Sequence, residues 1–213
     1  MNSRAIQAVL FDFDMTLVDS SYIITECTNL MADNMGLPRV TREDLLKVIG
    51  LPIEESWIAL WGRFEQEWLD YYRSHFRSME QGGFIKFPGS FDVPTLLKSK
   101  GLKIGVVSNR RFASIALERT GLAPLFDTVI GLEDVTHAKP HPESLLLALE
   151  RVDAGTENAV YVGDTDIDMK TAIAAGVRGV GVTTGAFGRE QLQSAGAAWV
   201  CGDLREIPEL LCL

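Results

Sequence analysis

The sequence predicts an α/β protein with a Rossmann-like, doubly wound parallel sheet and an inserted four-helix cap. Short apolar runs near the start of the chain and through its second half alternate with segments whose apolar residues recur at helical spacing. Strands that alternate with helices are typical of a parallel sheet. The stretch from about residue 21 to 84 breaks this alternation, because it contains no convincing strand. A length of 213 residues suits one core with a sizeable insertion.

The expected strands are short apolar runs that end at turn-forming or charged residues. They are Ala8–Phe11, Lys103–Val107, Thr128–Ile130, Ala159–Val162 and Gly179–Val182, with a further candidate at Ala198–Val200. The expected helices of the core are Thr95–Lys100, Phe112–Thr120, Pro142–Arg151 and Asp166–Ala175. Pro142 suits the first turn of a helix, and Gly121 and Gly176 stand where C-terminal caps belong.

The insertion carries helical patterns that are separated by glycine- and proline-containing turns. These patterns are Tyr22–Met35, Thr41–Ile49, Ile53–Leu60 and Phe64–Ser78. We therefore expect residues 1–20 and 85–213 to form the core and residues 21–84 to form a helical cap. Trp57 and Trp61 lie one helical turn apart, which indicates the packed interior of the cap more than a ligand-binding surface.

The charge balance restricts the partners that the protein can bind. Lys and Arg total 20 against 29 Asp and Glu, for a formal net charge of −9. A negative surface repels phosphate backbones, so nucleic acids and anionic membranes are disfavoured and a small molecule is the expected partner. Composition leaves the choice between monomer and dimer open.

Targeting signals and disulfide patterns are not expected either. Asp12 and Asp14 interrupt the only apolar run near the N-terminus, which argues against a signal peptide. No stretch approaches the ~18 apolar residues of a membrane span. Cys27, Cys201 and Cys212 are too scattered to indicate a disulfide framework or a zinc site. We expect a cytoplasmic protein.

Acidic residues follow two of the expected strands. Asp12 and Asp14 end the first apolar run and would point to one face of a strand, while Asp164 ends another and Asp168 follows four residues later. Open α/β sheets bind ligands at the carboxyl ends of their strands. Asp12, Asp14 and Asp164 would form an all-oxygen site that suits Mg²⁺, and Asp168 is assigned to the same metal-binding edge. A helix N-terminus also favours acids, and this simpler explanation fits Asp166 best.

Hydroxyl and cationic groups lie at the ends of other expected strands. Ser108 and Asn109 follow Lys103–Val107, and Lys139 precedes an expected helix. A hydroxyl, a backbone N–H at a helix start and an ammonium group can together hold a phosphoryl group while charge develops on it. A lone serine is usually a helix cap and a lone lysine is usually solvated, so their joint position carries the argument. The phosphate-loop and serine-nucleophile motifs are absent from the sequence.

Four ordered motifs resemble those of the haloacid dehalogenase superfamily. They are Asp12-Phe13-Asp14-Met15-Thr16, then Ser108-Asn109, then Lys139-Pro140, then Gly163-Asp164 with Asp168. The helical insertion lies where that superfamily carries a cap of the first type. Phe87-Pro88-Gly89 and Gly50-Leu51-Pro52 are similar to the phosphoglycolate phosphatase branch.

The resemblance implies a role for each site residue. Asp12 would be the nucleophile that forms an aspartyl phosphate, and Asp14 the general acid and then the general base. Magnesium would be held by Asp12, Asp164 and the backbone carbonyl of Asp14. Lys139 would hold transferring oxygens together with Ser108, and Asp168 would orient Lys139 or a metal-bound water. The expected substrate-binding residues are Thr16, Gly50, Ser108, Asn109, Arg110 and Lys139.

The sequence thus predicts a Mg²⁺-dependent phosphatase that acts on a small phosphorylated metabolite. The loop around Gly50 contains no Lys or Arg, which favours a simple phosphatase over a sugar-phosphate mutase. Arg110 would bind a substrate carboxylate or would be an exposed arginine at a helix start. A phosphotransferase, a mutase and a pyrophosphatase of the same superfamily are alternatives, and a non-catalytic phospho-aspartate module is an alternative from another class. Such receiver modules have ~120 residues and lack a large helical insertion.

Overall fold

The predicted strands form one six-stranded parallel sheet in the computed structural model, which describes residues 6–213. The strands are β1 (Ala8–Phe11), β4 (Lys103–Val107), β5 (Thr128–Ile130), β6 (Ala159–Gly163), β7 (Arg178–Val182) and β8 (Trp199–Cys201). Their order across the sheet is β5-β4-β1-β6-β7-β8, which is a Rossmann-like arrangement. Each expected strand is therefore confirmed. The argument against a signal peptide concerns the N-terminal segment, and residues 1–5 of that segment lie outside the described residues.

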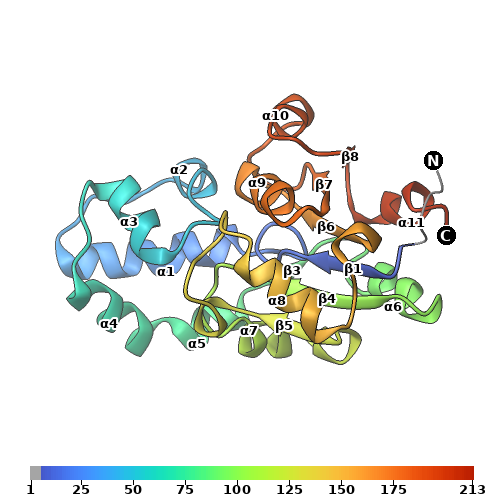
Figure 1. Cartoon of the computed structure of the whole chain (residues 1–213). Helices are drawn as coiled ribbons and strands as arrows, with labels where there is room; N and C mark the ends of the chain where they lie inside the picture. The colour runs from blue at the N-terminus through green and yellow to red at the C-terminus, as the bar shows by residue number, and fades with distance from the viewer. Residues whose placement is uncertain (1–5) are drawn as a thin grey trace.

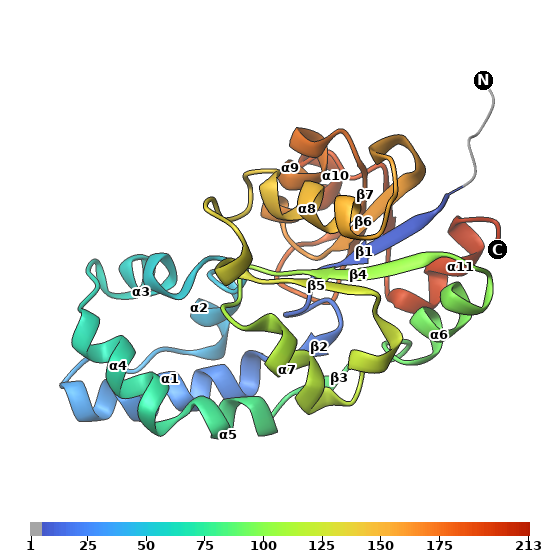
Figure 2. The same cartoon turned by 60° about the horizontal axis from the view of Figure 1, so that its bottom comes forward.

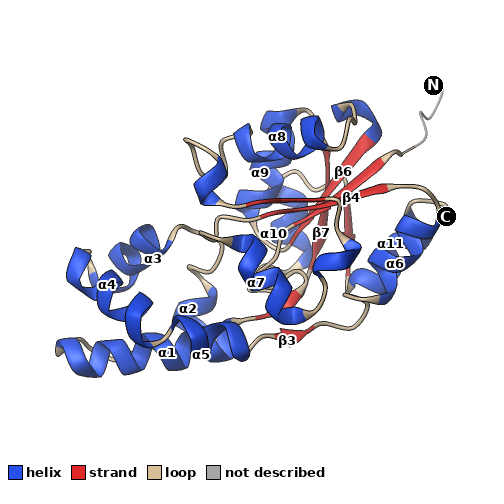
Figure 3. Cartoon of the chain, turned by 90° about the horizontal axis from the view of Figure 1, so that it is seen from below, coloured by secondary structure: helices blue, strands red, loops and turns tan. Residues whose placement is uncertain are grey.

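Helices cover both faces of this sheet (Figure 3). They are α6 (Asp92–Ser99), α7 (Ala113–Thr120), α8 (Glu143–Arg151), α9 (Asp166–Ala175), α10 (Arg189–Ser194) and α11 (Ile207–Leu210). Val9 and Phe11 of β1 pack into the apolar layer that contains α6, α7 and α11. Ala8 and Leu10 face the layer of α8 and α9. This alternation follows from the two-residue period of a strand and makes β1 the buried centre of the sheet.

Short 3₁₀ turns connect several of these elements. They are Ala123–Leu125, Leu132–Asp134, Thr156–Asn158 and Leu204–Glu206. Helix α9 begins and ends where the sequence predicts, because Thr165 caps its first turn and the left-handed Gly176 ends it. Helix α6 begins three residues before the predicted start. Pro94 lies in its first turn, where the missing N–H of a proline costs no helical hydrogen bond.

The inserted segment is helical and gathers at one end of the molecule (Figures 1 and 2). Its helices are α1 (Ser21–Met35), α2 (Arg42–Leu46), α3 (Ile53–Trp61), α4 (Gln66–His75) and α5 (Arg77–Gly82). They share an apolar cluster that includes Trp57, Trp68 and Tyr72. The chain enters and leaves this segment through an antiparallel pair that the sequence did not predict, β2 (Val18–Asp19) and β3 (Ile85–Lys86).

The predicted helix Phe64–Ser78 is wrong in one respect, because the structure breaks it into α4 and α5. The break lies at Phe76, whose φ of −116° departs from helical geometry. Its ring packs edge-on against Tyr71 and Tyr72, with centroid distances of 5.9 and 6.1 Å. Phe76 also packs on the apolar cluster of the inserted helices, and its carbonyl accepts from the thiol of Cys27 on α1 at 3.9 Å. The break thus lies where Phe76 contacts another helix, and α1–α5 replace the expected four helices. Within residues 6–213, no helix has the length and apolar character needed to cross a membrane.

Candidate active site

A buried lysine connects the acidic residues at the carboxyl edge of the sheet. Asp12 follows β1 and Asp164 follows β6, and these two strands are hydrogen-bonded neighbours. The Nζ atom of Lys139 lies 2.9 Å from Oδ1 of Asp12 and 2.7 Å from Oδ1 of Asp168. It also donates to the Tyr161 hydroxyl at 2.8 Å. The topology thus brings together residues that are up to 156 positions apart in the sequence (Asp12 and Asp168), as the strand ends predict.

Asp168 is held on both of its carboxylate oxygens. Oδ1 accepts hydrogen bonds from Lys139 and, at 3.0 Å, from the Tyr161 hydroxyl. Oδ2 accepts from the backbone N–H and the hydroxyl of Thr165, at 3.1 and 2.6 Å, in a capping box at the start of α9. These contacts suit a residue that orients Lys139. Tyr161 and Thr165 were missed by the sequence analysis, although a tyrosine within a buried strand generally needs a partner for its hydroxyl.

The site holds more negative than positive charge. Burial raises the pKa of Asp12 from 3.8 to about 7; Lys139 opposes this shift, and Asp168 adds to it. Burial also raises the pKa of Asp164 well above its usual value, with Asp168 and Asp12 as further causes. Burial alone would lower the pKa of Lys139, but the adjacent Asp12 and Asp168 raise it. One ammonium group therefore faces three buried carboxylates.

The chemistry of these residues fits a divalent cation. One carboxylate oxygen from each of Asp12, Asp164 and Asp168 lies within 4.8 Å of the others. In residues 6–213, Asp12 and Asp164 each accept a side-chain hydrogen bond on Oδ1 alone, which leaves the other oxygen for a ligand. Hard cations such as Mg²⁺ prefer oxygen ligands of this kind. The backbone of Gly185 approaches so closely that a Cβ there would lie 1.9 Å from Oδ2 of Asp164.

The carboxylate of Asp14 lies outside this acidic group. It accepts two hydrogen bonds from Arg110, from Nε at 3.0 Å and from Nη2 at 2.7 Å. Arg110 also donates through Nη1 to Glu80 of α5, and Glu80 accepts from the Tyr72 hydroxyl at 2.5 Å. The expectation that the Asp14 carboxylate joins the cation site is therefore corrected. Arg110 is not an exposed helix-start arginine, because its side chain is 16% exposed and two carboxylates bind its guanidinium group.

Asn109, in the loop after β4, forms hydrogen bonds with the loop that contains Gly50 and with the loop that contains Lys139. Its Nδ2 atom donates to the carbonyl of Gly50 at 2.9 Å and to that of Lys139 at 3.1 Å. Its Oδ1 atom accepts from the backbone N–H of Lys139 at 2.8 Å. Gly50 belongs to the inserted segment, so this amide links the insertion to the loop that carries the buried lysine.

The two predicted hydroxyl groups are also buried at the site. Thr16 donates from Oγ1 to Oδ1 of Asp164 at 3.0 Å and is fully buried. Ser108 follows β4, and its Oγ atom accepts a hydrogen bond from the backbone N–H of Arg110 at 3.1 Å. Because that contact uses the oxygen as an acceptor, the hydroxyl proton of Ser108 is free to be donated to a ligand.

A cavity of about 150 Å³ lies between the inserted helices and the carboxyl edge of the sheet. Asp12, Asp14, Ser108, Asn109, Arg110 and Gly50 line it, so the structure brings most of the predicted site residues to one space. Its lining also includes Arg73, Arg77 and Arg111, which the sequence analysis did not single out. The four-residue spacing of Arg73 and Arg77 was the available signal, since it places both on one helical face.

Comparisons with known proteins agree with this geometry. Residues 9–182 match the family model described as haloacid dehalogenase-like hydrolase. The chain is 35% identical over 196 residues to "Probable phosphatase IndB" of Dickeya dadantii, covering 88% of this chain and 85% of that protein. It is 30% identical over 194 residues to "Pyrophosphatase PpaX" of Bacillus pumilus, covering 90% of each.

A solved structure shows the same similarity. The crystal structure of "a predicted phosphatase" from Clostridium acetobutylicum superposes with a TM-score of 0.88 at 26% identity. The match covers 99% of this chain and 100% of that one. The family model spans β1 to β7, and therefore the whole acidic edge described above. The chain belongs to the family of haloacid dehalogenase-like hydrolases.

Proposed function

We propose that this protein is a Mg²⁺-dependent phosphatase that hydrolyses a small phosphomonoester through an aspartyl-phosphate intermediate. The observation that carries the proposal is the buried group of Asp12, Asp164 and Asp168 around Lys139, of which Asp12 lines the cavity together with Asp14. A volume of about 150 Å³ favours a small substrate. The negative net charge supports a metabolite as the partner in preference to a nucleic acid or a membrane.

In the first step, a carboxylate oxygen of Asp12 attacks phosphorus in line with the leaving oxygen. The new Asp12–phosphorus bond forms as the bond to the leaving alkoxide breaks, and Asp14 donates a proton to that alkoxide. Lys139 and the hydroxyl of Ser108 stabilise the charge on the transferring oxygens. Arg110 and Asn109 act as positioning residues, since they hold Asp14 and the Lys139 loop.

In the second step, water replaces Asp12. The carboxylate of Asp14 takes a proton from that water, whose oxygen attacks phosphorus while the bond to Asp12 breaks. Inorganic phosphate leaves, Asp12 returns as a carboxylate and Asp14 is again protonated, so the cycle closes.

Magnesium would be held by Asp12 and Asp164, whose second carboxylate oxygens accept no hydrogen bond from residues 6–213. When bound, the cation neutralises the repulsion between the nucleophile and the phosphate dianion. Asp168 has both oxygens engaged by protein groups, which supports orientation of Lys139 as its function.

We also propose that residues 21–84 act as a cap that excludes bulk water from a core formed by residues 1–20 and 85–213. The separate apolar cluster of the inserted helices supports this division, and so does the β2–β3 pair at its base. Hydrolysis of pyrophosphate is the second candidate activity. The 30% identity to "Pyrophosphatase PpaX" favours it over a mutase.

Phosphate release tests the proposed function. Purified protein with Mg²⁺ is expected to hydrolyse a generic aryl phosphate and to lose this activity in EDTA, because Asp12 and Asp164 then repel the substrate. A panel that contains phosphoglycolate, pyrophosphate, sugar phosphates and nucleotide monophosphates, ranked by kcat/KM, would identify the substrate. Full activity in EDTA, or release of halide from a haloacid without metal, would contradict the proposal.

Mg²⁺ is also expected to stabilise the fold in a pH-dependent manner. A buried carboxyl whose folded pKa is raised favours folding below its unfolded pKa, and that contribution is lost as pH rises through the folded value of about 7 for Asp12. Without metal, the contribution of Asp12 to the free energy of unfolding should therefore be smaller at about pH 7.5 than at about pH 5. Mg²⁺ at about 100 times its Kd should raise Tm by about 5–10 °C at the higher pH.

The Mg²⁺-induced shift in Tm should be much smaller at the lower pH, where Asp12 and Asp164 bind protons in place of the cation. Differential scanning calorimetry at both pH values measures this directly. Asp164→Asn should lose most of the shift at the higher pH. An equal shift at both pH values would place the cation elsewhere.

A further inference from the structure

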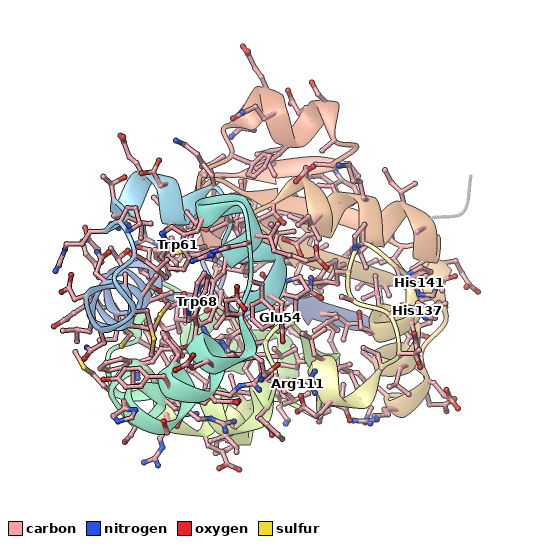
Figure 4. All side chains as sticks on the ribbon, turned by 90° about the vertical axis from the view of Figure 1, so that its left-hand side faces the viewer. Glu54, Trp61, Trp68, Arg111, His137 and His141 are labelled. Atoms are coloured by element: carbon pink, nitrogen blue, oxygen red, sulfur yellow. The ribbon has the colours of Figure 1, made fainter. Side chains whose placement is uncertain are left out.

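Three arginines bring positive charge to the cavity from separate elements. Arg73 lies on α4, Arg77 on α5 and Arg111 in the loop that follows β4, and all three line the cavity. Arg73 and Arg77 are half-buried, whereas Arg111 is exposed. Figure 4 views this end of the molecule, with Arg111 and Glu54 labelled between the inserted helices and the core.

These guanidinium groups lack acidic partners at ion-pair distance. Within residues 6–213, the side chains of Arg73 and Arg111 form no hydrogen bond or ion pair. The Arg77 guanidinium group stacks over the Phe112 ring, 4.6 Å from its centroid. Glu54 is the nearby carboxylate that also lines the cavity. Burial lowers the pKa of Arg73, Glu54 opposes this shift, and Arg111 and Arg77 add to it. The three cations are therefore close enough to repel one another, and Glu54 and Asp70 offset part of that repulsion at Arg73. The other carboxylates of the lining, which are Asp12, Asp14 and Glu80, already accept hydrogen bonds from Lys139 or Arg110.

The neighbouring Arg110 shows the contrasting arrangement. Its guanidinium group is fully engaged by Asp14 and Glu80. It offsets one of their two negative charges and holds both carboxylates by hydrogen bonds, so that they are oriented toward Arg110 and not toward the other three arginines. The remaining cavity wall includes apolar side chains such as Val48 and Trp57, which lower the local dielectric constant and strengthen the field of unpaired cations. This part of the cavity is suited to an anion.

We propose that Arg73, Arg77 and Arg111 bind a second anionic group, a carboxylate or a phosphate, on the leaving-group side of the substrate. This inference rests on the proposed phosphatase function. Arg111 adjoins Arg110, which holds Asp14, the residue assigned to protonation of the leaving oxygen. On this proposal, the three arginines hold the part of the substrate that leaves as the alcohol.

The cavity volume limits the length of such a substrate. A cavity of about 150 Å³ suits a phosphoryl group with a short tail better than a long substrate. The absence of Lys and Arg from the Gly50 loop favoured a simple phosphatase over a sugar-phosphate mutase. The structure supplies the cations from α4, α5 and the loop after β4 instead, and so the substrate class becomes a short compound with two anionic ends.

Two esters that differ at the tail test the inference. Phosphoglycolate carries a carboxylate where ethyl phosphate carries a methyl group. The wild-type protein should hydrolyse phosphoglycolate with a kcat/KM at least about 100-fold higher, since each 1.4 kcal/mol of binding is tenfold. Arg73→Gln and Arg111→Gln should each reduce this ratio by about tenfold, mainly through KM. Because the readout is a ratio, a general loss of activity cancels.

Matched variants separate charge from packing. Arg73→Lys keeps the charge and should retain most of the preference, whereas Arg119→Gln removes an exposed arginine that does not line the cavity and should leave the ratio unchanged. Raised ionic strength should increase KM for phosphoglycolate more than for ethyl phosphate. Pyrophosphate, tested in parallel, distinguishes a phosphate tail from a carboxylate tail. If the glutamine variants reduce kcat/KM more for pyrophosphate than for phosphoglycolate, the subsite binds a phosphate tail, and the reverse result indicates a carboxylate tail.

Binding measurements distinguish failure of this inference from failure of the proposed function. Phosphonoacetate and ethylphosphonate cannot be hydrolysed, so calorimetry with the wild-type protein reads the subsite without turnover. Tighter binding of phosphonoacetate that is lost in Arg73→Gln would support the subsite even if no ester were hydrolysed. Hydrolysis of both esters with a ratio near one, or a ratio that the arginine variants leave unchanged, would overturn it.

Discussion

Asp12→Asn is expected to reduce kcat by on the order of 10⁴- to 10⁶-fold, as removal of a catalytic nucleophile does in other hydrolases. An amide of nearly the same shape cannot attack phosphorus, so the covalent route closes. The side chain is buried and hydrogen-bonded to Lys139, so the substitution also removes one negative charge beside that ammonium group. Single-turnover phosphate release with Mg²⁺ measures the loss, and circular dichroism confirms that the variant is folded.

Asp166→Asn is the matched control for this substitution. Asp166 belongs to the same acidic motif as Asp164 and Asp168, but it pairs with Lys170 on the surface of α9. Its removal should change kcat by less than about threefold, because a surface ion pair contributes little. Near-full activity of Asp12→Asn, or an equal loss in Asp166→Asn, would refute the assignment of Asp12 as the nucleophile.

Trp57→Ala is expected to lower the free energy of unfolding by about 3–5 kcal/mol, the usual cost of truncating a buried large aromatic residue. Trp57 is 2% exposed and is the centre of the apolar cluster of the inserted helices. Its ring lies 5.6 Å from that of Tyr72 and 6.2 Å from that of Phe64, measured between centroids. Urea unfolding followed by far-ultraviolet circular dichroism measures the change.

Ile58→Ala provides the comparison within α3. Ile58 follows Trp57 directly but is 49% exposed, so its truncation should cost about 1 kcal/mol or less. If the inserted helices unfold separately from the sheet, Trp57→Ala should shift an early transition and leave the later one in place. Equal effects of the two substitutions would mean that Trp57 does not organise the insertion.

The strand ends were predictable because the signal is local. A buried parallel strand is a short apolar run, and the residue after it must lie at the carboxyl edge of the sheet. Asp12, Ser108 and Asp164 therefore come together once the strand order is set. Asp168 was assigned to the same site, and its place in the capping box of α9 is also a local pattern.

The contacts between the insertion and the core were not predictable in this way. Within the insertion, the break at Phe76 was not predictable either, because it lies where Phe76 joins the apolar cluster of the inserted helices and accepts from Cys27 of α1. The sequence left Arg110 as either a ligand for a substrate carboxylate or an exposed arginine at a helix start, whereas in the structure Asp14 of the core and Glu80 of α5 bind its guanidinium group. Such pairings depend on how two packed units dock, and nothing in the local spacing records it.

The sequence by itself determined the sheet, its acidic edge and the family to which the chain is similar, because periodicity and strand ends are local properties of the chain. Tertiary structure alone decided that the Asp14 carboxylate turns to Arg110 and away from Asp12, Asp164 and Asp168. It also decided that Arg73, Arg77 and Arg111 meet in one cavity. The physical reason is that electrostatic partners are chosen by distance in space, which the docking of the inserted helices on the sheet sets.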